Sequence, residues 1–405
     1  MKEPIYDILI QNTRILTPDM AIRSGVDVAI KDGMISSICS SGSLSCQEAE
    51  QTVDGSLLLW MPGLTDGHMH TCQQLLRGKI LDALPMIWTR IMLPFESTLT
   101  PEAVSLSAAL CSLEMIRGGT TSFLDAGGIH MDEAAKIYIK SGLRGALTLS
   151  TMDDTKVPDS MRADAAESIS RLNEYYNTWN GSGDGRLSVY YSLRSLISCS
   201  EELIRGVFEA ASERSAMVEA HMNEYPNEIN YHLERYQMRP MEYLDSLGVL
   251  SDHFVSAHSL LLSEHEIELM AANGVKAVHC PFSNCGKGVP NTPRLLESGI
   301  SVAFGTDGTA HGGMSLFQEM KIFRSVMNIF HGVPNNDPKV MPAETIFKII
   351  LEGGAAALDE EGNLGRLEAG YKADFISINM NQAHLCPTGN KLRTLFECVG
   401  AGDVA

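Results

Sequence analysis

"LLLWMPGLTDGHMHTCQQLLRG", residues 57–78, contains an apolar run that stops at a Pro-Gly and is followed by two histidines, His68 and His70. On a β-strand, residues i and i+2 point to the same face, so these two imidazoles would project side by side. Neighbouring neutral imidazoles can chelate a divalent cation such as Zn²⁺. Because a chain with 12 histidines in 405 residues often contains such a pair by chance, the metal interpretation needs further ligands at other strand ends.

From residue 57 onward, short apolar runs rich in β-branched residues alternate with segments of helical period, such as "PEAVSLSAALCSLEMIRGG" (101–119). Eight such runs begin with the stretch quoted above, continue at 120–127, 144–152, 186–195, 216–224, 254–260 and 275–284, and end with "SVAFGTDG" (301–308). This alternation indicates βα units and a parallel sheet. Eight units over about 300 residues predict an α/β protein with a (β/α)8 TIM-type barrel. A doubly wound open sheet is the alternative, which the lack of a GxGxxG after the first strand disfavours.

The two chain ends differ from this central pattern. Residues 5–38 alternate apolar and polar residues between turn signals such as "KDG", which is the period of half-buried antiparallel strands. After residue 362, "GNLGRLEAGYKADFISINM" returns to strand and turn. We therefore expect a small β domain made from residues 1–57 and 363–405, with the barrel at 58–362. We also expect its C-terminal part to be incomplete at "VGAGDVA".

Charge and cysteine content disfavour several classes of protein. The chain has 50 acidic and 31 basic residues, a net charge of −19, so nucleic acid is not an expected partner, because an acidic surface repels phosphates. Nine scattered cysteines favour reduced thiols in the cytoplasm over a disulfide framework. No apolar stretch approaches the ~20 residues that span a bilayer. "MKEPIYDILI" also lacks the apolar core and cleavage site of a signal peptide.

Polar side chains gather at the C-terminal ends of the predicted strands, where barrel enzymes carry their chemistry. Beyond the first histidine pair, they are Arg194, His221, Glu224, His258, His279 and Asp307. Each has an ordinary explanation by itself, because strand-end histidines are mostly structural and "GTDG" is a common turn. Their coincidence at several strand ends predicts a metal site. His279 is better suited to shaping the pocket than to binding metal, as are Ser283 and Asn284.

Six motifs occur in an order that points to a known family: "PGLTDGHMH", "EMIRGGTTSF", "HMNE", "VSAHS", "VHCPFSN" and "FGTDG". The ordered set resembles the amidohydrolase superfamily, specifically its mononuclear aminohydrolase branch. That branch contains guanine deaminases, S-adenosylhomocysteine and methylthioadenosine deaminases, and triazine hydrolases. The resemblance runs from about residue 5 to the end of the chain. It implies a (β/α)8 barrel with a small β-sandwich, and a homo-oligomer, commonly a dimer.

The resemblance also implies one divalent metal ion, with Zn²⁺ favoured over Fe²⁺, held by His68, His70, His221 and Asp307. Such an ion lowers the pKa of its bound water to about 7, so that metal-bound hydroxide can attack the substrate at neutral pH. Asp307 would accept the water proton, and His258 would orient the nucleophile. Glu224 would protonate the ring nitrogen and then the leaving amine. Attack on an amidine-like ring carbon with loss of ammonia is a deamination.

Five further residues bear on the substrate. Gln73 and Arg194 resemble the glutamine and arginine that hold the purine edge in guanine deaminase. Trp88 and Glu96 resemble the adenosine-type enzymes, where the glutamate binds ribose hydroxyls. The histidine that those enzymes carry near the arginine is absent here, which argues against a nucleoside. His311 stands in "GTAHGGMS", a departure from the family pattern, and is a candidate to face the substrate.

We therefore predict a metal-dependent deaminase of a heterocyclic small molecule, with guanine, another oxopurine or a pterin as the first expectation. The alternatives are a deaminase of adenosine, S-adenosylhomocysteine or methylthioadenosine, and a triazine-type chlorohydrolase or N-alkylamine hydrolase. Glu224 favours deamination, because a halide leaves without being protonated. A catalytically inactive barrel that serves as a binding protein is the alternative from a different class. Such a protein is expected to have lost ligands that this chain retains.

Overall fold

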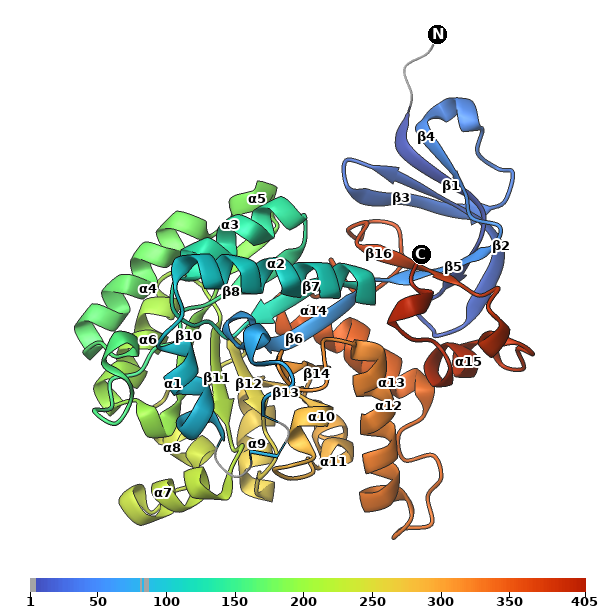
Figure 1. Ribbon diagram of the computed structural model, residues 1–405. Helices are drawn as coiled ribbons and strands as arrows, with labels where there is room; N and C mark the ends of the chain where they lie inside the picture. The colour runs from blue at the N-terminus through green and yellow to red at the C-terminus, as the bar shows by residue number, and fades with distance from the viewer. Residues whose placement is uncertain (1–4, 81, 84–86) are drawn as a thin grey trace.

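The computed structural model describes residues 5–80, 82–83 and 87–405, and its centre consists of two five-stranded parallel sheets (Figure 1). In the first sheet the order is β15 (Asp307–Gly308), β6 (Leu64–His70), β7 (Thr120–Asp125), β8 (Arg144–Leu147) and β9 (Leu187–Val189). In the second it is β10 (Tyr191–Ser195), β11 (Val218–Met222), β12 (Phe254–His258), β13 (Lys276–His279) and β14 (Val302–Phe304). The predicted α/β class with parallel sheets is confirmed.

The two parallel sheets are linked at both edges by short interruptions of a strand. Only Tyr190 separates β9 from β10, and its N–H donates to the carbonyl of Leu147 on β8 (2.9 Å). Between β14 and β15 lie Gly305 and Thr306, and the N–H of Gly305 donates to the carbonyl of His279 on β13 (2.8 Å). Backbone hydrogen bonds between neighbouring strands therefore continue from one sheet into the other at each interruption.

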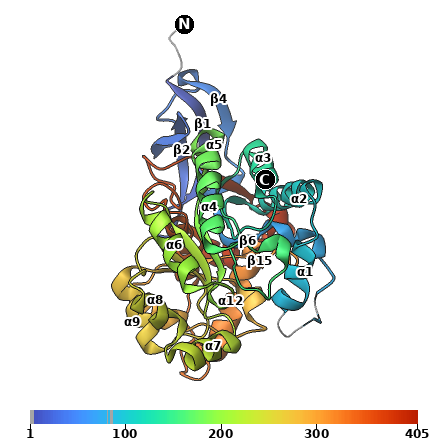
Figure 2. The same cartoon turned by 90° about the vertical axis from the view of Figure 1, so that its left-hand side faces the viewer.

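Helices follow the parallel strands and cover their outer side (Figures 1 and 2). The longer ones are α2 (Pro101–Gly118), α3 (Met131–Ser141), α4 (Ala165–Trp179), α6 (Glu201–Ser212), α7 (Pro226–Tyr236), α8 (Pro240–Ser246), α9 (Glu264–Asn273), α12 (Leu316–Met327) and α15 (Lys391–Glu397). The shorter ones are α1 (Leu93–Glu96), α5 (Ser182–Gly185), α10 (Pro281–Asn284), α11 (Thr292–Glu297), α13 (Ala343–Lys348) and α14 (Gly354–Ala357).

Local sequence sets the ends of α2. The Thr100 side chain accepts a hydrogen bond from the N–H of Ala103, and Pro101 fits the first helical position. Gly119 then ends the helix with a φ of 80°, which glycine adopts without strain. In the described part of the chain, no single helix is both long and apolar enough to cross a bilayer. The bent pair Trp88–Glu96 and Pro101–Gly118 (112°) meets these criteria jointly, by length and composition alone.

Both chain ends contribute to a third, mixed sheet, which lies beside the parallel sheets (Figure 1). Its order is β16 (Phe375–Asn379), β5 (Leu58–Pro62), β1 (Tyr6–Leu16), β2 (Ile22–Lys31) and β3 (Met34–Ser40), with β4 (Ala49–Asp54) also paired to β1. β16 runs antiparallel to β5, so a late segment of the chain completes a sheet begun by the first strands.

The quoted stretch 57–70, predicted as a single strand, forms two strands in different sheets. Leu58–Pro62 pairs in the mixed sheet, whereas Leu64–His70 pairs in a parallel sheet. The change occurs at Gly63, where a side chain would collide with Thr121. The prediction of one strand was therefore wrong, because a continuous apolar run does not reveal which partner each half pairs with.

Glu319 on α12 gives the fold a pH dependence. Its buried carboxylate accepts a hydrogen bond from the N–H of Phe282 (2.7 Å), and burial raises its pKa from 4.5 to about 8. Between these pH values the folded state holds a proton that the unfolded state has lost, so stability falls as the pH rises. We expect Glu319→Gln, which keeps the acceptor, to raise the free energy of unfolding at pH 8.5 by about 2–4 kcal/mol. Urea unfolding should show this gain shrinking towards pH 5. Equal gains at both pH values would contradict the assignment.

Candidate metal centre and active site

Five side chains that could hold a metal ion meet at the carboxyl ends of β6, β11 and β12 and at Asp307, the first residue of β15. His70 Nε2 lies 3.0 Å from His221 Nε2, and Asp307 Oδ1 lies 3.7 Å from His68 Nε2 and 3.5 Å from His70 Nε2. Ligand atoms of the set His68, His221, His258 and Asp307 all lie within 4.8 Å of one another. The four predicted ligands and His258 thus lie together.

These separations fit a four-coordinate cation. Tetrahedral ligands about 2.0–2.1 Å from Zn²⁺ lie about 3.3 Å from each other, and the measured separations of 3.0–3.7 Å bracket that value. His68 Nε2 and His258 Nε2 are buried and have no hydrogen-bond partner among the described residues. Three imidazoles and a carboxylate form the type of donor set that a catalytic zinc site uses.

Charge at the site also favours a bound cation. Burial by itself lowers the pKa of His68, but the nearby carboxylates of Asp307 and Glu219 outweigh burial and raise this pKa to about 10. Positive charge is therefore stabilised at this position. Burial and neighbouring cationic groups hold the pKa of His70 and of His221 well below 6.5. Both rings are therefore neutral near pH 7, which is the form that binds a metal.

Local geometry brings β6 and the β14–β15 link together. The carboxylate of Asp66 accepts hydrogen bonds from the N–H of His68 (3.3 Å) and from the N–H (3.0 Å) and hydroxyl (2.6 Å) of Thr306. A Cβ at Gly305 would lie 2.5 Å from the His68 carbonyl oxygen, so glycine is needed there. His258 and Asp307 have φ values of 71° and 60°, a strained conformation typical of functional residues.

Glu219 on β11 is a buried residue that the sequence analysis missed. Its Oε1 lies 2.9 Å from His68 Nδ1, on the side of the ring opposite the other ligands. A carboxylate at Nδ1 orients an imidazole so that Nε2 faces the metal. The signal was present, because Glu219 lies two residues before His221 and therefore shares its face of the strand.

Glu224 lies beside the metal-binding cluster and carries an unexpected partner. Its Oε1 is 3.5 Å from His258 Nε2 and 2.5 Å from Nζ of Lys287. Lys287 is buried, and its Nζ also lies 3.1 Å from Asp307 Oδ2. Burial lowers the pKa of Lys287, but Asp307 and Glu224 raise it well above 10.5, so the ammonium stays charged. Lys287 follows the seventh predicted strand in "CGKG", where nothing in the sequence marks it as a site residue.

The three residues expected to shape the pocket contact the cluster instead. Ser283 Oγ donates to Asp307 Oδ2 (2.5 Å), and the amide of Asn284 lies 3.1 Å from His258 Nδ1. His279 Nδ1 lies 2.8 Å from the carbonyl oxygen of His258. These three side chains hold the ligands and do not line the small cavity beside them.

A small cavity opens beside the cluster. It is lined by His70, Gln73, Ile87, Trp88, Met92, Arg194, Ser195, His221, Glu224, Tyr225, Lys287, Asp307 and His311. Four of the five predicted substrate-binding residues thus face it. The fifth, Glu96, lies behind them, where it accepts hydrogen bonds from Gln73 (2.8 Å) and Arg194 (3.0 and 3.1 Å).

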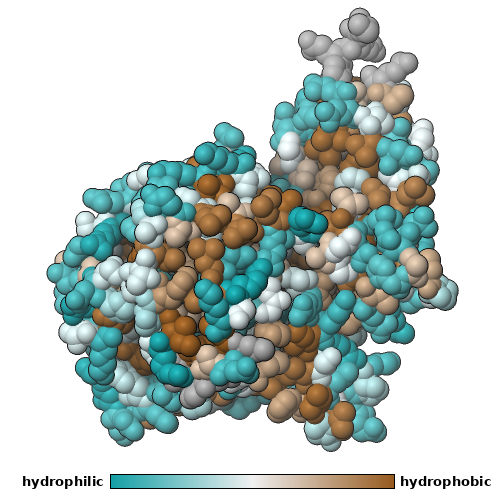
Figure 3. All heavy atoms as spheres, in the orientation of Figure 1, coloured by the Kyte–Doolittle hydropathy of each residue, from teal (hydrophilic) through white to brown (hydrophobic). Residues whose placement is uncertain are grey.

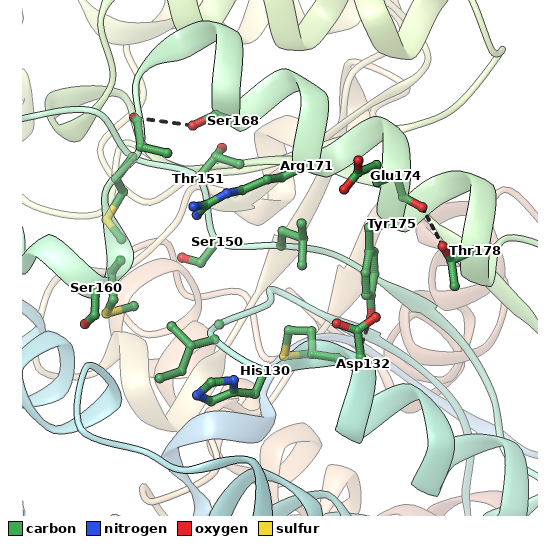
Figure 4. A pocket seen from close by; sticks show the side chains of 17 residues that line it. His130, Asp132, Ser150, Thr151, Ser160, Ser168, Arg171, Glu174, Tyr175 and Thr178 are labelled. Atoms are coloured by element: carbon green, nitrogen blue, oxygen red, sulfur yellow. Dashed lines mark hydrogen bonds between the residues drawn. The ribbon is translucent and has the colours of Figure 1, made fainter.

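A larger groove lies over the ends of β7 and β8 and along α4 (Figure 4). Its polar lining residues, among them His130, Arg171 and Glu174, include none of the predicted site residues. Ser150 in the groove accepts a hydrogen bond from Arg194 of the small cavity (3.2 Å), but the groove and the cavity share no lining residue. The metal-binding cluster therefore belongs to the smaller cavity.

Known proteins resemble this chain over nearly its full length. It is 31% identical over 405 residues to a 5-methylthioadenosine/S-adenosylhomocysteine deaminase of Acetivibrio thermocellus, covering 98% of this chain and 91% of the relative. It is 34% identical over 407 residues to a 5'-deoxyadenosine deaminase of Methanothermobacter thermautotrophicus, covering 97% and 90%. A zinc-bound adenosine deaminase from Xanthomonas campestris superimposes with a TM-score of 0.90 at 26% identity, covering 100% and 91%.

The sequence profile of the amidohydrolase family matches residues 59–402. This match spans both parallel sheets, all five side chains of the candidate metal site and β16. The resemblance inferred from the six ordered motifs is confirmed. The chain belongs to the amidohydrolase family.

Proposed function

We propose that the protein is a zinc-dependent deaminase that hydrolyses the 6-amino group of an adenine nucleoside, one whose 5' position is modified. As a family member it is a hydrolase of carbon–nitrogen bonds. The relatives support the adenosine-type alternative better than the oxopurine or pterin expected first. The observation that carries the proposal is the complete cluster of His68, His70, His221 and Asp307 with Glu224 beside it.

Each residue of the cluster has a task that its position allows. A divalent ion held by the three histidines and Asp307 would supply hydroxide at neutral pH. Asp307 would take up a proton from the nucleophile, and His258, 3.5 Å from Glu224, would orient the nucleophile. Glu224 would deliver a proton to the purine ring nitrogen and then to the departing amine. Lys287, 2.5 Å from Glu224, holds that carboxylate at the edge of the cavity.

The cavity lining fits a flat heterocycle. Trp88 offers an aromatic face, Gln73 offers a carboxamide oxygen that has no hydrogen-bond partner among the described residues, and Arg194 offers its planar guanidinium. Glu96, the residue that resembles a ribose-binding glutamate, is held by both Gln73 and Arg194. We propose that Gln73, Trp88, Arg194 and His311 contact the substrate directly, and that Glu96 positions Gln73 and Arg194.

A base without ribose is the second candidate, and one observation favours it. Arg194 faces the cavity as a planar donor, which suits the oxo group or ring acceptor of guanine. The residue that follows it, Ser195, is not the histidine that the adenosine-type enzymes carry near this arginine. This candidate therefore differs from the first in the contacts around Arg194, and the substrate test separates the two.

We further infer that the two parallel sheets form one closed (β/α)8 barrel. The links at Tyr190 and at Gly305–Thr306 support closure, because pairing continues across both. We propose that the small β domain comprises residues 1–62 and 363–405, since β5 pairs within its sheet. All nine cysteines are unpaired thiols, which supports a reducing, cytoplasmic compartment.

Ammonia release across a substrate panel tests the function. The panel contains 5'-deoxyadenosine, 5'-methylthioadenosine, S-adenosylhomocysteine, adenosine, guanine, a pterin and a chlorotriazine. We expect kcat/KM for the best adenine nucleoside to exceed that for guanine by about 100-fold or more, because the relatives that support the first candidate are adenosine-type deaminases. A preference for guanine would replace the first candidate with the second. Chloride release without ammonia would contradict both.

A further inference from the structure

Helix α2 exposes an apolar stripe that no described part of the chain covers. Leu106, Leu110, Leu113 and Ile116 are 54%, 38%, 60% and 47% exposed, although their side chains are large and apolar. The opposite face of the helix is fully buried, through residues such as Val104, Cys111 and Met115. In Figure 3, apolar side chains gather over α2 on the face towards the viewer.

The stripe is accessible to another helix. Figure 1 shows α2 in front of the parallel sheets, and Figure 2 places it at the edge of the molecule. The 18-residue helix is about 27 Å long. The four exposed side chains are spaced three or four residues apart, so they lie next to one another along one face of the helix and form a continuous stripe. Monomeric soluble proteins seldom leave a contiguous apolar surface of this kind exposed.

The exposed face of α2 is self-complementary in the antiparallel direction. Leu106 and Leu113 are equally distant along the chain from the midpoint between Ala109 and Leu110. The exposed Glu102 in the first turn and the exposed Arg117 in the last are also equally distant from that midpoint. Two copies related by a two-fold axis at the midpoint would pair leucine with leucine, and each glutamate with the partner's arginine.

We propose that α2 is the interface of a homodimer, in which two copies pack antiparallel across a two-fold axis near Ala109 and Leu110. The small Ala109 side chain permits the interaxial distance of about 8–10 Å at which helices pack. Antiparallel packing also sets opposite ends of the two helix dipoles beside each other. The interface is isologous, so it closes at two copies.

Sedimentation velocity of the full chain over about 1–50 µM tests the proposal. The wild type is expected to have twice the monomer mass of 44.1 kDa. Leu110→Glu places two carboxylates at the axis and is expected to weaken dimerisation at least 100-fold. The matched control is Leu233→Glu on α7, an exposed leucine away from the stripe (41% exposed), which should leave the dimer intact. Circular dichroism establishes that each variant is folded.

Charge reversal tests the antiparallel pairing itself. Glu102→Arg and Arg117→Glu should each weaken the dimer several-fold, because like charges then face each other. The double variant should restore the wild-type dissociation constant. A monomeric wild type would overturn the proposal and assign the stripe to another protein or to a lipid surface. A dimer that survives Leu110→Glu, or charge reversals without mutual rescue, would overturn it as well.

Discussion

Removal of bound metal with a chelator is expected to abolish ammonia release, and one equivalent of Zn²⁺ per chain is expected to restore it. The reason is that the proposed reaction needs a divalent ion to lower the pKa of water to about 7, so that hydroxide is available at neutral pH. His221→Ala is expected to lower the metal content and to reduce kcat by at least about 10³-fold, measured by elemental analysis and ammonia release. His253→Ala, at a partly exposed histidine distant from the cluster, is the control.

Metal binding should also be visible without any substrate. A ligand that binds only the folded state adds RT ln(1 + [L]/Kd) to stability, about 2.7 kcal/mol at 100 times Kd. Thermal unfolding should therefore shift upward when Zn²⁺ is returned to the stripped wild type, and not in His221→Ala. Full activity in protein that is free of transition metal would contradict the proposed site.

Glu224→Gln is expected to reduce kcat by about 10²–10⁴-fold while the metal content stays at the wild-type level. Glutamine preserves the size of the side chain but cannot transfer a proton, so substrate binding should change little and kcat should carry the loss. In this variant Lys287 still forms an ion pair with Asp307, 3.1 Å away, so the substitution does not leave an unpaired buried cation. Steady-state kinetics and metal analysis on one preparation provide the measurement.

The matched control for this substitution is Glu268→Gln on α9, which makes the same chemical change at an exposed position. It should leave kcat, KM and metal content unchanged. If Glu224→Gln retained wild-type kcat, another group would have to protonate the leaving amine. If it lost metal together with activity, the residue would be acting on the integrity of the site and not as a proton donor.

Much of the fold and of the metal-binding cluster could be predicted because the determining signals are local. The HxH pair, the strand-end histidine at 221 and the aspartate at 307 each follow a short apolar run, and parallel strands bring such ends to one edge of a sheet. The split at Gly63 could not be predicted in this way, since both halves of the run are apolar and only tertiary pairing distinguishes them.

The surroundings of the cluster were less predictable for a different reason. Lys287 lies in a loop without periodicity, and its role depends on burial between two carboxylates that are distant in sequence. The ion pair between Glu96 and Arg194 likewise joins residues far apart along the chain. Such long-range pairs leave no spacing pattern, whereas Glu219 could have been found by its alternation with His221.

The position of β5 between β1 and β16 has a consequence for how the chain matures. During synthesis the amino-terminal strands leave the ribosome first, but the edge of β5 stays open until residues 375–379 have been translated. An open edge is a template for pairing with other chains. The nascent polypeptide therefore exposes this open edge while the entire central region is translated. Pairing of residues 375–379 with β5 then covers the edge and protects growing chains from association.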